Sequence, residues 1–185
     1  LLRGLCSCHI QNIIEAWKKA YEGDKTSIFG GIVALNREVN RELAELLKPI
    51  FLEIVMAPSY TEDALEVLCS KKNLRVLKVD MDRSRIPAES RQFVSVNGGL
   101  LVQNQDLGIK AAEAEQCVTR IRPTEEQLED LNFTWKIVKH VKSNAIVVGK
   151  NGMTYGVGAG QMNRVGSAEI ALKQAAATLK EEGKD

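Results

Sequence analysis

Apolar positions along this chain recur at two spacings, one typical of helices and one typical of short strands. A repeat of about three to four residues predicts helices at residues 10–21, 39–47, 59–68, 124–138 and 167–182. Short apolar runs bounded by glycine, proline or asparagine predict strands at residues 28–35, 51–56, 74–79, 93–96, 100–103, 118–121, 146–149 and 153–157. Because helices alternate with strands, the pattern favours an α/β fold built in layers.

Local signals refine the ends of two helices and the domain organisation. Ser59-x-x-Glu62 and Thr124-x-x-Gln127 have the spacing of capping boxes, which start helices. The helix from Thr124 is expected to bury a stripe formed by Leu128, Leu131, Trp135 and Val138. Arg122-Pro123-Thr124 is the best boundary signal, so we expect one unit over residues 1–121 and a second over residues 122–185.

Composition narrows the function classes. The 185 residues carry a net charge of +1, which indicates neither nucleic-acid binding nor an anionic membrane surface as partner. No apolar run approaches the ~20 residues that cross a bilayer. The four cysteines show no disulfide framework, which fits a reducing, cytoplasmic location. Cys6-Ser7-Cys8-His9 lacks the second ligand pair that zinc sites need, so we predict no metal there.

The pattern richest in chemistry lies near the end of the chain. Asn144 precedes one predicted strand, Asn151-Gly152 predicts a hairpin turn, and a glycine loop leads to Arg164. The hairpin brings its ends together, so Asn144 and Arg164 are expected to face one pocket for a small polar or anionic ligand. A turn amide and a solvated arginine are the alternatives. The glycines do not fit the dinucleotide pattern, because Asn163 occupies its third glycine position, and we interpret them as clearing space for a flat ligand.

Five segments in a fixed order carry a resemblance. They are EAWKKAYE at 15–22 with SIFGGIVA at 27–34, LEIVMAPSY at 52–60, GGLLVQ at 98–103, KSNA at 142–145 and GAGQxxR at 158–164. Together they resemble the transformylase domain of the bifunctional purine-biosynthesis enzymes that join AICAR formyltransferase to IMP cyclohydrolase. The resemblance implies two cytidine-deaminase-like three-layer αβα subdomains, of which residues 1–121 form the latter part of the first and residues 122–185 the start of the second.

The resemblance implies an activity, ligands and an assembly. The family moves a formyl group from 10-formyltetrahydrofolate to the 5-amino group of AICAR, giving FAICAR, and builds its sites at a homodimer interface. Asn144 would then be the catalytic residue that contacts AICAR and orients the reacting amine, since an amide both donates and accepts hydrogen bonds. Asn163 and Arg164 would line the folate site.

Further residues receive roles from the same resemblance. Phe29 would lie near the pterin and the substrate, where stacking is useful, although core packing is the commonest fate of phenylalanine. Glu53 would bind the substrate, and it lies in an apolar run where burial without a partner is costly. Ser143 and the backbone carbonyls of Val138 and Val141 match part of a potassium site.

The chain departs from the family pattern at the expected catalytic base. The family's Lys-His pair belongs to a Lys-His-x-x-Pro-Cys-Gly segment upstream of the Glu-Ala-Trp helix, and residues 1–10 contain neither part of it. Lys139-His140 instead falls late in a helix, where it would complement the helix dipole. We therefore expect the central part of a transformylase domain, without the cyclohydrolase domain, with little turnover of its own. A non-catalytic binding or assembly module on the same scaffold is the alternative.

Overall fold

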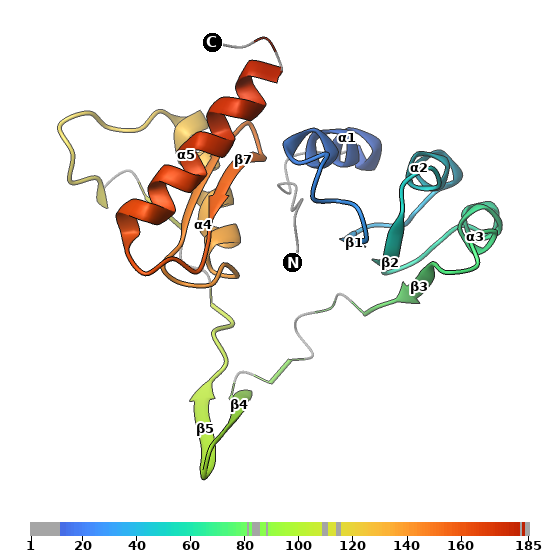
Figure 1. Cartoon of the computed structure of the whole chain (residues 1–185), viewed down its shortest axis with the longest axis horizontal. Helices are drawn as coiled ribbons and strands as arrows, with labels where there is room; N and C mark the ends of the chain where they lie inside the picture. The colour runs from blue at the N-terminus through green and yellow to red at the C-terminus, as the bar shows by residue number, and fades with distance from the viewer. Residues whose placement is uncertain are drawn as a thin grey trace.

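A computed structural model of the chain describes residues 12–80, 82, 86–87, 89–108, 111–113, 116–181 and 183. In Figure 1 these residues form two lobes and a projecting hairpin. The described part of the first lobe combines three helices with a parallel sheet, and that of the second combines two helices with an antiparallel strand pair. The structure is therefore α/β, as the alternation of apolar patterns predicted. The division of the chain at residues 121 and 122 stays a prediction.

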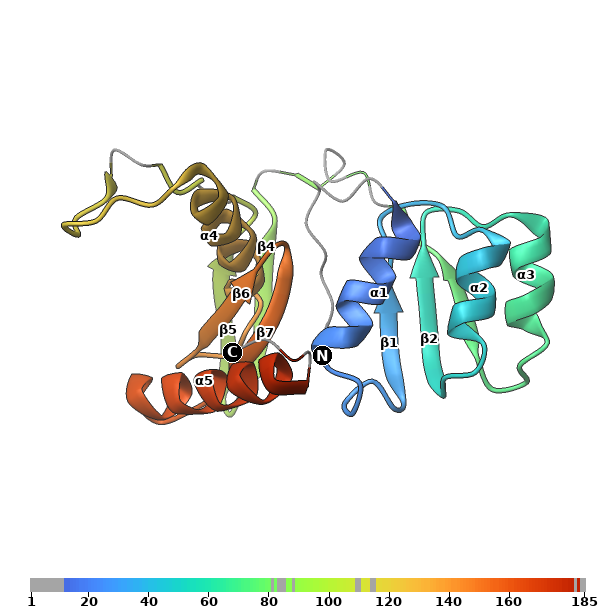
Figure 2. The same cartoon turned by 90° about the horizontal axis from the view of Figure 1, so that it is seen from above.

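The first lobe contains a parallel sheet whose strands follow chain order. Its elements are α1 (Ile13–Gly23), β1 (Gly31–Ala34), α2 (Arg41–Leu47), β2 (Leu52–Ala57), α3 (Glu62–Cys69) and β3 (Arg75–Lys78). Because parallel crossovers are right-handed, the order β1-β2-β3 places α2 and α3 on the same face of the sheet. Figure 2 shows α1 on that face as well. Within the described residues helices thus cover one face of this sheet, and the predicted three-layer arrangement is not confirmed.

The core of the first lobe lies between the helices and the sheet. Its buried side chains are Ile14, Trp17, Val33, Val39, Leu43, Ala44, Leu47, Leu52, Val55, Ala57, Ala64, Val67 and Leu68. Asn12 and Asn40 start α1 and α2, since their side-chain oxygens accept backbone N–H groups at 2.8 and 3.0 Å. The Tyr60 hydroxyl lies 3.0 and 2.9 Å from carbonyl oxygens of β2 and β3. Burial raises the pKa of Tyr60 to about 12.

The start of α3 differs from the prediction. Its N-cap residue is Thr61, so the capping box at Ser59-x-x-Glu62 is wrong. Backbone bonds with Val39 hold residues 59 to 61 in an extended bridge, which delays the helix to Glu62. The Ser59 hydroxyl donates instead to Glu38 at 2.8 Å.

The second lobe is built on a hairpin between two helices. Its elements are α4 (Glu125–Val138), β6 (Ile146–Lys150), β7 (Met153–Gly158) and α5 (Arg164–Glu181), and β6 pairs antiparallel with β7. The backbones of β7 and α5 approach very closely. A Cβ atom on Gly156 would lie 1.9 Å from the Ala171 carbonyl oxygen, and one on Gly158 would lie 1.9 Å from that of Ser167. The glycines of β7 are therefore required for packing against α5.

The helix α4 begins as predicted but buries a different face. Thr124 and Gln127 form the capping box. The buried side chains are Phe133 and Ile137, whereas two members of the predicted stripe, Leu131 and Trp135, are 49% and 52% exposed. The predicted stripe is thus wrong. The reason is a long-range fit: Gly149 of β6 leaves room for the Thr134 side chain, whose methyl carbon would lie 2.6 Å from a Cβ there.

The third structural unit is the hairpin of β4 (Arg91–Val96) and β5 (Gly99–Asn104), which confirms the strands predicted at residues 93–96 and 100–103. Every residue of both strands is exposed. The exposed set includes six large apolar side chains, namely Phe93, Val94, Val96, Leu100, Leu101 and Val102. Figure 1 shows the hairpin extending away from both lobes.

The strand predicted at residues 118–121 does not form. This segment is irregular, and Val118 and Ile121 are 98% and 85% exposed. The Thr119 hydroxyl donates to the Ile121 carbonyl at 2.8 Å, so local side-chain bonds replace a strand ladder there.

The helix α1 also contacts the second lobe. The Lys19 ammonium donates to the Asn151 carbonyl at 3.4 Å, and a Cβ on Gly23 would lie 2.9 Å from the Thr154 carbonyl oxygen. The first lobe therefore meets the hairpin of the second through this helix. None of the helices in the described residues has the length and apolar character needed to cross a membrane.

Candidate functional site

Asn144 lies where the open end of the β6–β7 hairpin meets the loop before α5. Its backbone N–H donates to the Gln161 carbonyl at 3.3 Å, and the Gln161 N–H donates back at 3.4 Å. The side-chain Nδ2 of Asn144 donates to the carbonyls of Gln161 and Met162 at 3.0 and 3.2 Å. Both donors of the amide are thus held by the loop. Its acceptor, Oδ1, makes no hydrogen bond within the described part of the chain.

The start of α5 presents the two residues predicted for folate. Asn163 accepts the Gly166 N–H at 2.7 Å, which is the contact of an N-cap side chain. Arg164 is the first helical residue and is exposed. The helix therefore begins three residues earlier than predicted, and Arg164 belongs to it. The structure brings Asn144, Asn163 and Arg164 into one strand–loop–helix unit, while a shared pocket for Asn144 and Arg164 stays a prediction.

A residue that sequence reasoning missed completes this unit. Ser167 is the only buried polar residue among those described. Its hydroxyl donates to the Asn144 carbonyl at 2.7 Å. The available signal was the small-residue spacing Ser167, Ala171 and Ala175, which matches the alternating glycines of β7.

The interpretation of those glycines needs a correction. Gly156 and Gly158 do not clear space for a ligand, since the backbone of α5 occupies the space beside both. Gly160 has a φ of +65° and makes the turn after β7, where its N–H donates to the Lys142 carbonyl at 2.8 Å. The glycines therefore shape the scaffold that supports Asn144.

Phe29 and Glu53 lie in the other lobe. Phe29 precedes β1 and is 77% exposed, with its ring centroid 5.0 Å from that of Phe51. Glu53, near the start of β2, is exposed, so the expected cost of burying it does not arise. Phe29 and Glu53 both lie near the start of a strand. Because β1 and β2 are parallel, these two residues lie toward the same end of the sheet. Figure 2 shows the starts of β1 and β2 in one lobe and the start of α5 in the other. The predicted site residues therefore form two groups.

Lys139 has a structural contact that the sequence did not reveal. Its ammonium donates to the Gly108 carbonyl at 3.0 Å and pairs with Asp106 at 3.4 Å. Its side chain is only 11% exposed, which ties the segment after β5 to the end of α4. This favours the structural reading of Lys139-His140, whose lack of a catalytic role stays a prediction.

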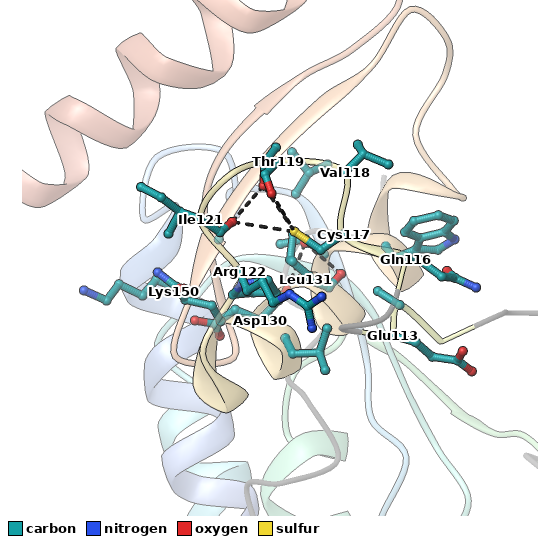
Figure 3. A pocket seen from close by; sticks show the side chains of 18 of the residues that line it. Glu113, Gln116, Cys117, Val118, Thr119, Ile121, Arg122, Asp130, Leu131 and Lys150 are labelled. Atoms are coloured by element: carbon teal, nitrogen blue, oxygen red, sulfur yellow. Dashed lines mark hydrogen bonds between the residues drawn. The ribbon is translucent and has the colours of Figure 1, made fainter.

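A cavity of about 840 Å³ that none of these residues lines lies between α4, β6 and the stretches 112–113 and 116–123 (Figure 3). Its wall includes Leu131, Trp135 and Cys117. Hydrogen bonds with the side chain and then the backbone of Thr119, and to a smaller extent the charge of Arg122, lower the pKa of the Cys117 thiol. The cavity contains none of the predicted site residues.

Two motifs predicted from the sequence lie at the start of the chain, and a separate prediction concerns metal binding. The cysteine–histidine motif at residues 6–9 and the missing Lys-His segment at residues 1–10 lie outside the described residues. In the part of the chain that is described, no three His, Cys, Asp or Glu side chains are grouped to hold a metal ion.

The fold and this unit define an α/β protein that presents an oriented amide beside a capped helix start. Comparison with known families identifies its class: residues 4–174 match the AICARFT/IMPCHase bienzyme model, and the chain belongs to this family. The bifunctional purine biosynthesis protein PurH of Anoxybacillus flavithermus is 59% identical over 165 residues, covering 89% of this chain and 32% of the relative.

Two further relatives agree. PurH of Bacillus subtilis is 56% identical over 166 residues, and PurH of Listeria welshimeri is 55% identical over 165 residues. In both cases 89% of this chain and 32% of the relative are covered. The chain thus spans about a third of the length of the curated relatives it matches.

Proposed function

We propose that this chain supplies part of an AICAR formyltransferase site, in which the formyl group of 10-formyltetrahydrofolate passes to the 5-amino group of AICAR. The proposal rests chiefly on Asn144, whose Nδ2 is occupied by two carbonyls while Oδ1 remains available. An amide oxygen fixed in this way accepts an N–H of the AICAR amine and aims the nitrogen lone pair at the formyl carbon. The new C–N bond then replaces the formyl bond to N10 of the folate. The amine gives up one proton to water and N10 takes one up, which releases tetrahydrofolate.

The neighbouring residues supply the folate side of the site in this proposal. Asn163 and Arg164 occupy the start of α5, directly after the loop that holds Asn144. The guanidinium of Arg164 suits an anionic group of the folate. Phe29 and Glu53 belong to the second group of residues and contribute an aromatic face and a carboxylate for AICAR.

The two groups lie in different lobes, which supports the proposal of a homodimer. In such a dimer a site combines one group from each copy. The exposed apolar side chains of β4 and β5 offer surface for this contact. Sedimentation at tens of micromolar, a typical range for weak association, tests the assembly. A monomer at that concentration contradicts it.

The alternative function is a binding or assembly module without turnover. It is favoured by residues 1–10, which lack both Lys-His and Pro-Cys-Gly. A lost general base typically lowers the rate by about 10²–10⁴-fold. We expect AICAR binding by calorimetry, with tetrahydrofolate release near background. Absence of AICAR and folate binding favours the scaffold, and turnover that disappears in His140→Ala would identify His140 as the base.

The predicted potassium site has little support. Ser143 and the carbonyls of Val138 and Val141 give three oxygen donors, and the Val138 carbonyl already accepts the Val141 N–H at 3.0 Å. Hard cations usually take about six or more oxygen ligands. These three donors do not fit the ion by themselves, and no step of the proposed reaction depends on it. The cytidine-deaminase-like layering and the cytoplasmic location likewise stay predictions.

A further inference from the structure

We propose that Ser167 is a positioning residue for Asn144, and that the first turns of α5 set the direction of the Asn144 amide. This inference rests on the proposed function, in which Asn144 contacts AICAR. Ser167 is fully buried, and its hydroxyl donates to the Asn144 backbone carbonyl at 2.7 Å. It therefore touches the backbone of the ligand-contacting residue without reaching any ligand itself.

The contact is held from two sides. On one side, the close approach of Gly158 to the Ser167 backbone fixes the distance between β7 and α5. On the other side, the Ser167 N–H donates to the Asn163 carbonyl at 3.4 Å within the first turn of α5. The hydroxyl therefore comes from a rigid element, and its rotation is limited by burial.

The Asn144 amide is fixed by the same unit. Its backbone carbonyl accepts from Ser167, and its Nδ2 donates to the carbonyls of Gln161 and Met162. If the Ser167 bond is lost, one of these anchors disappears and the Asn144 backbone gains freedom to rotate. The Nδ2 bonds then weaken, and Oδ1 no longer keeps a single direction. A residue that contacts a ligand needs this support. If its side chain is loosely held, binding must also order it, and that cost lowers the affinity.

The test compares four single variants of the complete chain, and the Asn144→Ala/Ser167→Ala double variant, with the parent. Ser167→Ala removes the donor, Ser167→Cys replaces it by a weaker S–H donor of similar shape, and Asn144→Ala removes the amide. Ala171→Gly is the matched control, since Ala171 is equally buried one turn further along α5 and its methyl side chain makes no hydrogen bond to Asn144. AICAR affinity is measured by calorimetry, the Asn144 side-chain amide signals by ¹H–¹⁵N NMR, and folding by thermal unfolding.

We expect Ser167→Ala to weaken AICAR binding by about three- to tenfold, the usual range for one hydrogen bond. The AICAR affinity of Ser167→Cys should lie between those of Ser167→Ala and the parent. The loss should vanish when Asn144 is already alanine, because Ser167 acts through Asn144. The two Nδ2 proton signals should move toward those of a free amide in Ser167→Ala and stay in place in Ala171→Gly. If Ser167→Ala does not fold, Ser167→Cys undergoes the same measurements.

The outcomes separate this inference from the proposed function. If Asn144→Ala weakens binding but Ser167→Ala does no more than Ala171→Gly, the positioning role is wrong and the function stands. If AICAR does not bind, or Asn144→Ala has no effect, the proposed AICAR contact is wrong. The NMR signals then decide alone: shifted Nδ2 signals in Ser167→Ala support the positioning of Asn144, and unchanged signals overturn it.

Discussion

The two hairpins of this chain have the same Asn-Gly turn sequence but opposite surroundings. Asn97-Gly98 joins β4 to β5, and Asn151-Gly152 joins β6 to β7. Four of the six residues of β7 are buried beneath neighbouring elements, whereas every residue of β4 and β5 is exposed. What differs is the segment that follows. After β7 comes α5, whose small residues meet the strand glycines, and no such helix covers β5 in the described structure.

The turns differ in a way that suits these surroundings. Asn151 and Gly152 both have positive φ values, 53° and 68°, as in the type I′ turn that matches strand twist. In the other hairpin only Gly98 is positive, with a φ of 83°. The Gly152 N–H also donates to Asp130 of α4 at 3.1 Å. The hairpin of β6 and β7 is thus anchored at the turn and at its open end, which makes it a support for Asn144.

The largest effect should come from adding one methyl group to β7. Gly158→Ala would place a carbon 1.9 Å from the Ser167 carbonyl oxygen, so the backbones must separate. Overpacking typically costs about 1–3 kcal/mol and occasionally more, and a clash with backbone should place this variant at the upper end. Gly99→Ala in β5 is the control, since nothing lies within 4 Å of its Cβ position. Urea unfolding should show a change within about 0.5 kcal/mol for Gly99→Ala. Equal losses would show that the two hairpins are equally packed.

The second prediction concerns the turns. Gly152→Ala forces alanine into a positive φ of 68°, which costs about 1–2 kcal/mol. Gly98→Ala has the same conformational conflict at 83°. Only Gly152→Ala should lower the global free energy of unfolding, because the hairpin of β4 and β5 opens locally without unfolding the lobes. Hydrogen exchange should show faster exchange confined to β4 and β5 in Gly98→Ala. A global loss there would contradict independent opening.

The same comparison explains which parts of the structure could be predicted from sequence. The turn at Asn151-Gly152 and the capping box at Thr124 depend on neighbours in the chain, and both were predicted correctly. The buried face of α4 depends on the fit of Thr134 against Gly149, and the glycines of β7 acquire their meaning only from α5. By contrast, the hairpin that lies between Asn144 and Arg164 was predictable from the Asn151-Gly152 turn. The separation of Phe29 from Asn144 follows from the packing of whole lobes, which no local pattern encodes.

The third prediction tests the anchor of the buried turn. Asp130→Ala removes the acceptor of the Gly152 N–H and should cost about 1 kcal/mol, as for one partly exposed hydrogen bond. Glu129→Ala, next to it on α4 and exposed, also removes a carboxylate but leaves the turn contact in place. Alanine is the better helix former at both positions, by slightly more over aspartate than over glutamate. The difference between the two variants in thermal unfolding measures the anchor. If Glu129→Ala loses as much as Asp130→Ala, the loss comes from α4 itself.

The smallest effect on folding should come from substitutions in the exposed hairpin of β4 and β5. Their main effect should be on self-association. Leu101 is 60% exposed in β5, and Leu172 is 60% exposed on α5. Because neither side chain is packed in the single chain, Leu101→Ser and Leu172→Ser should each change the free energy of unfolding by at most about 0.5 kcal/mol in dilute solution. If a second copy covers β4 and β5, Leu101→Ser should weaken self-association in sedimentation by about tenfold or more, as for a buried interface anchor, while Leu172→Ser should not. A matching loss of stability in the dilute Leu101→Ser chain would mean that the hairpin packs within its own molecule, and the contrast between the two hairpins would fail.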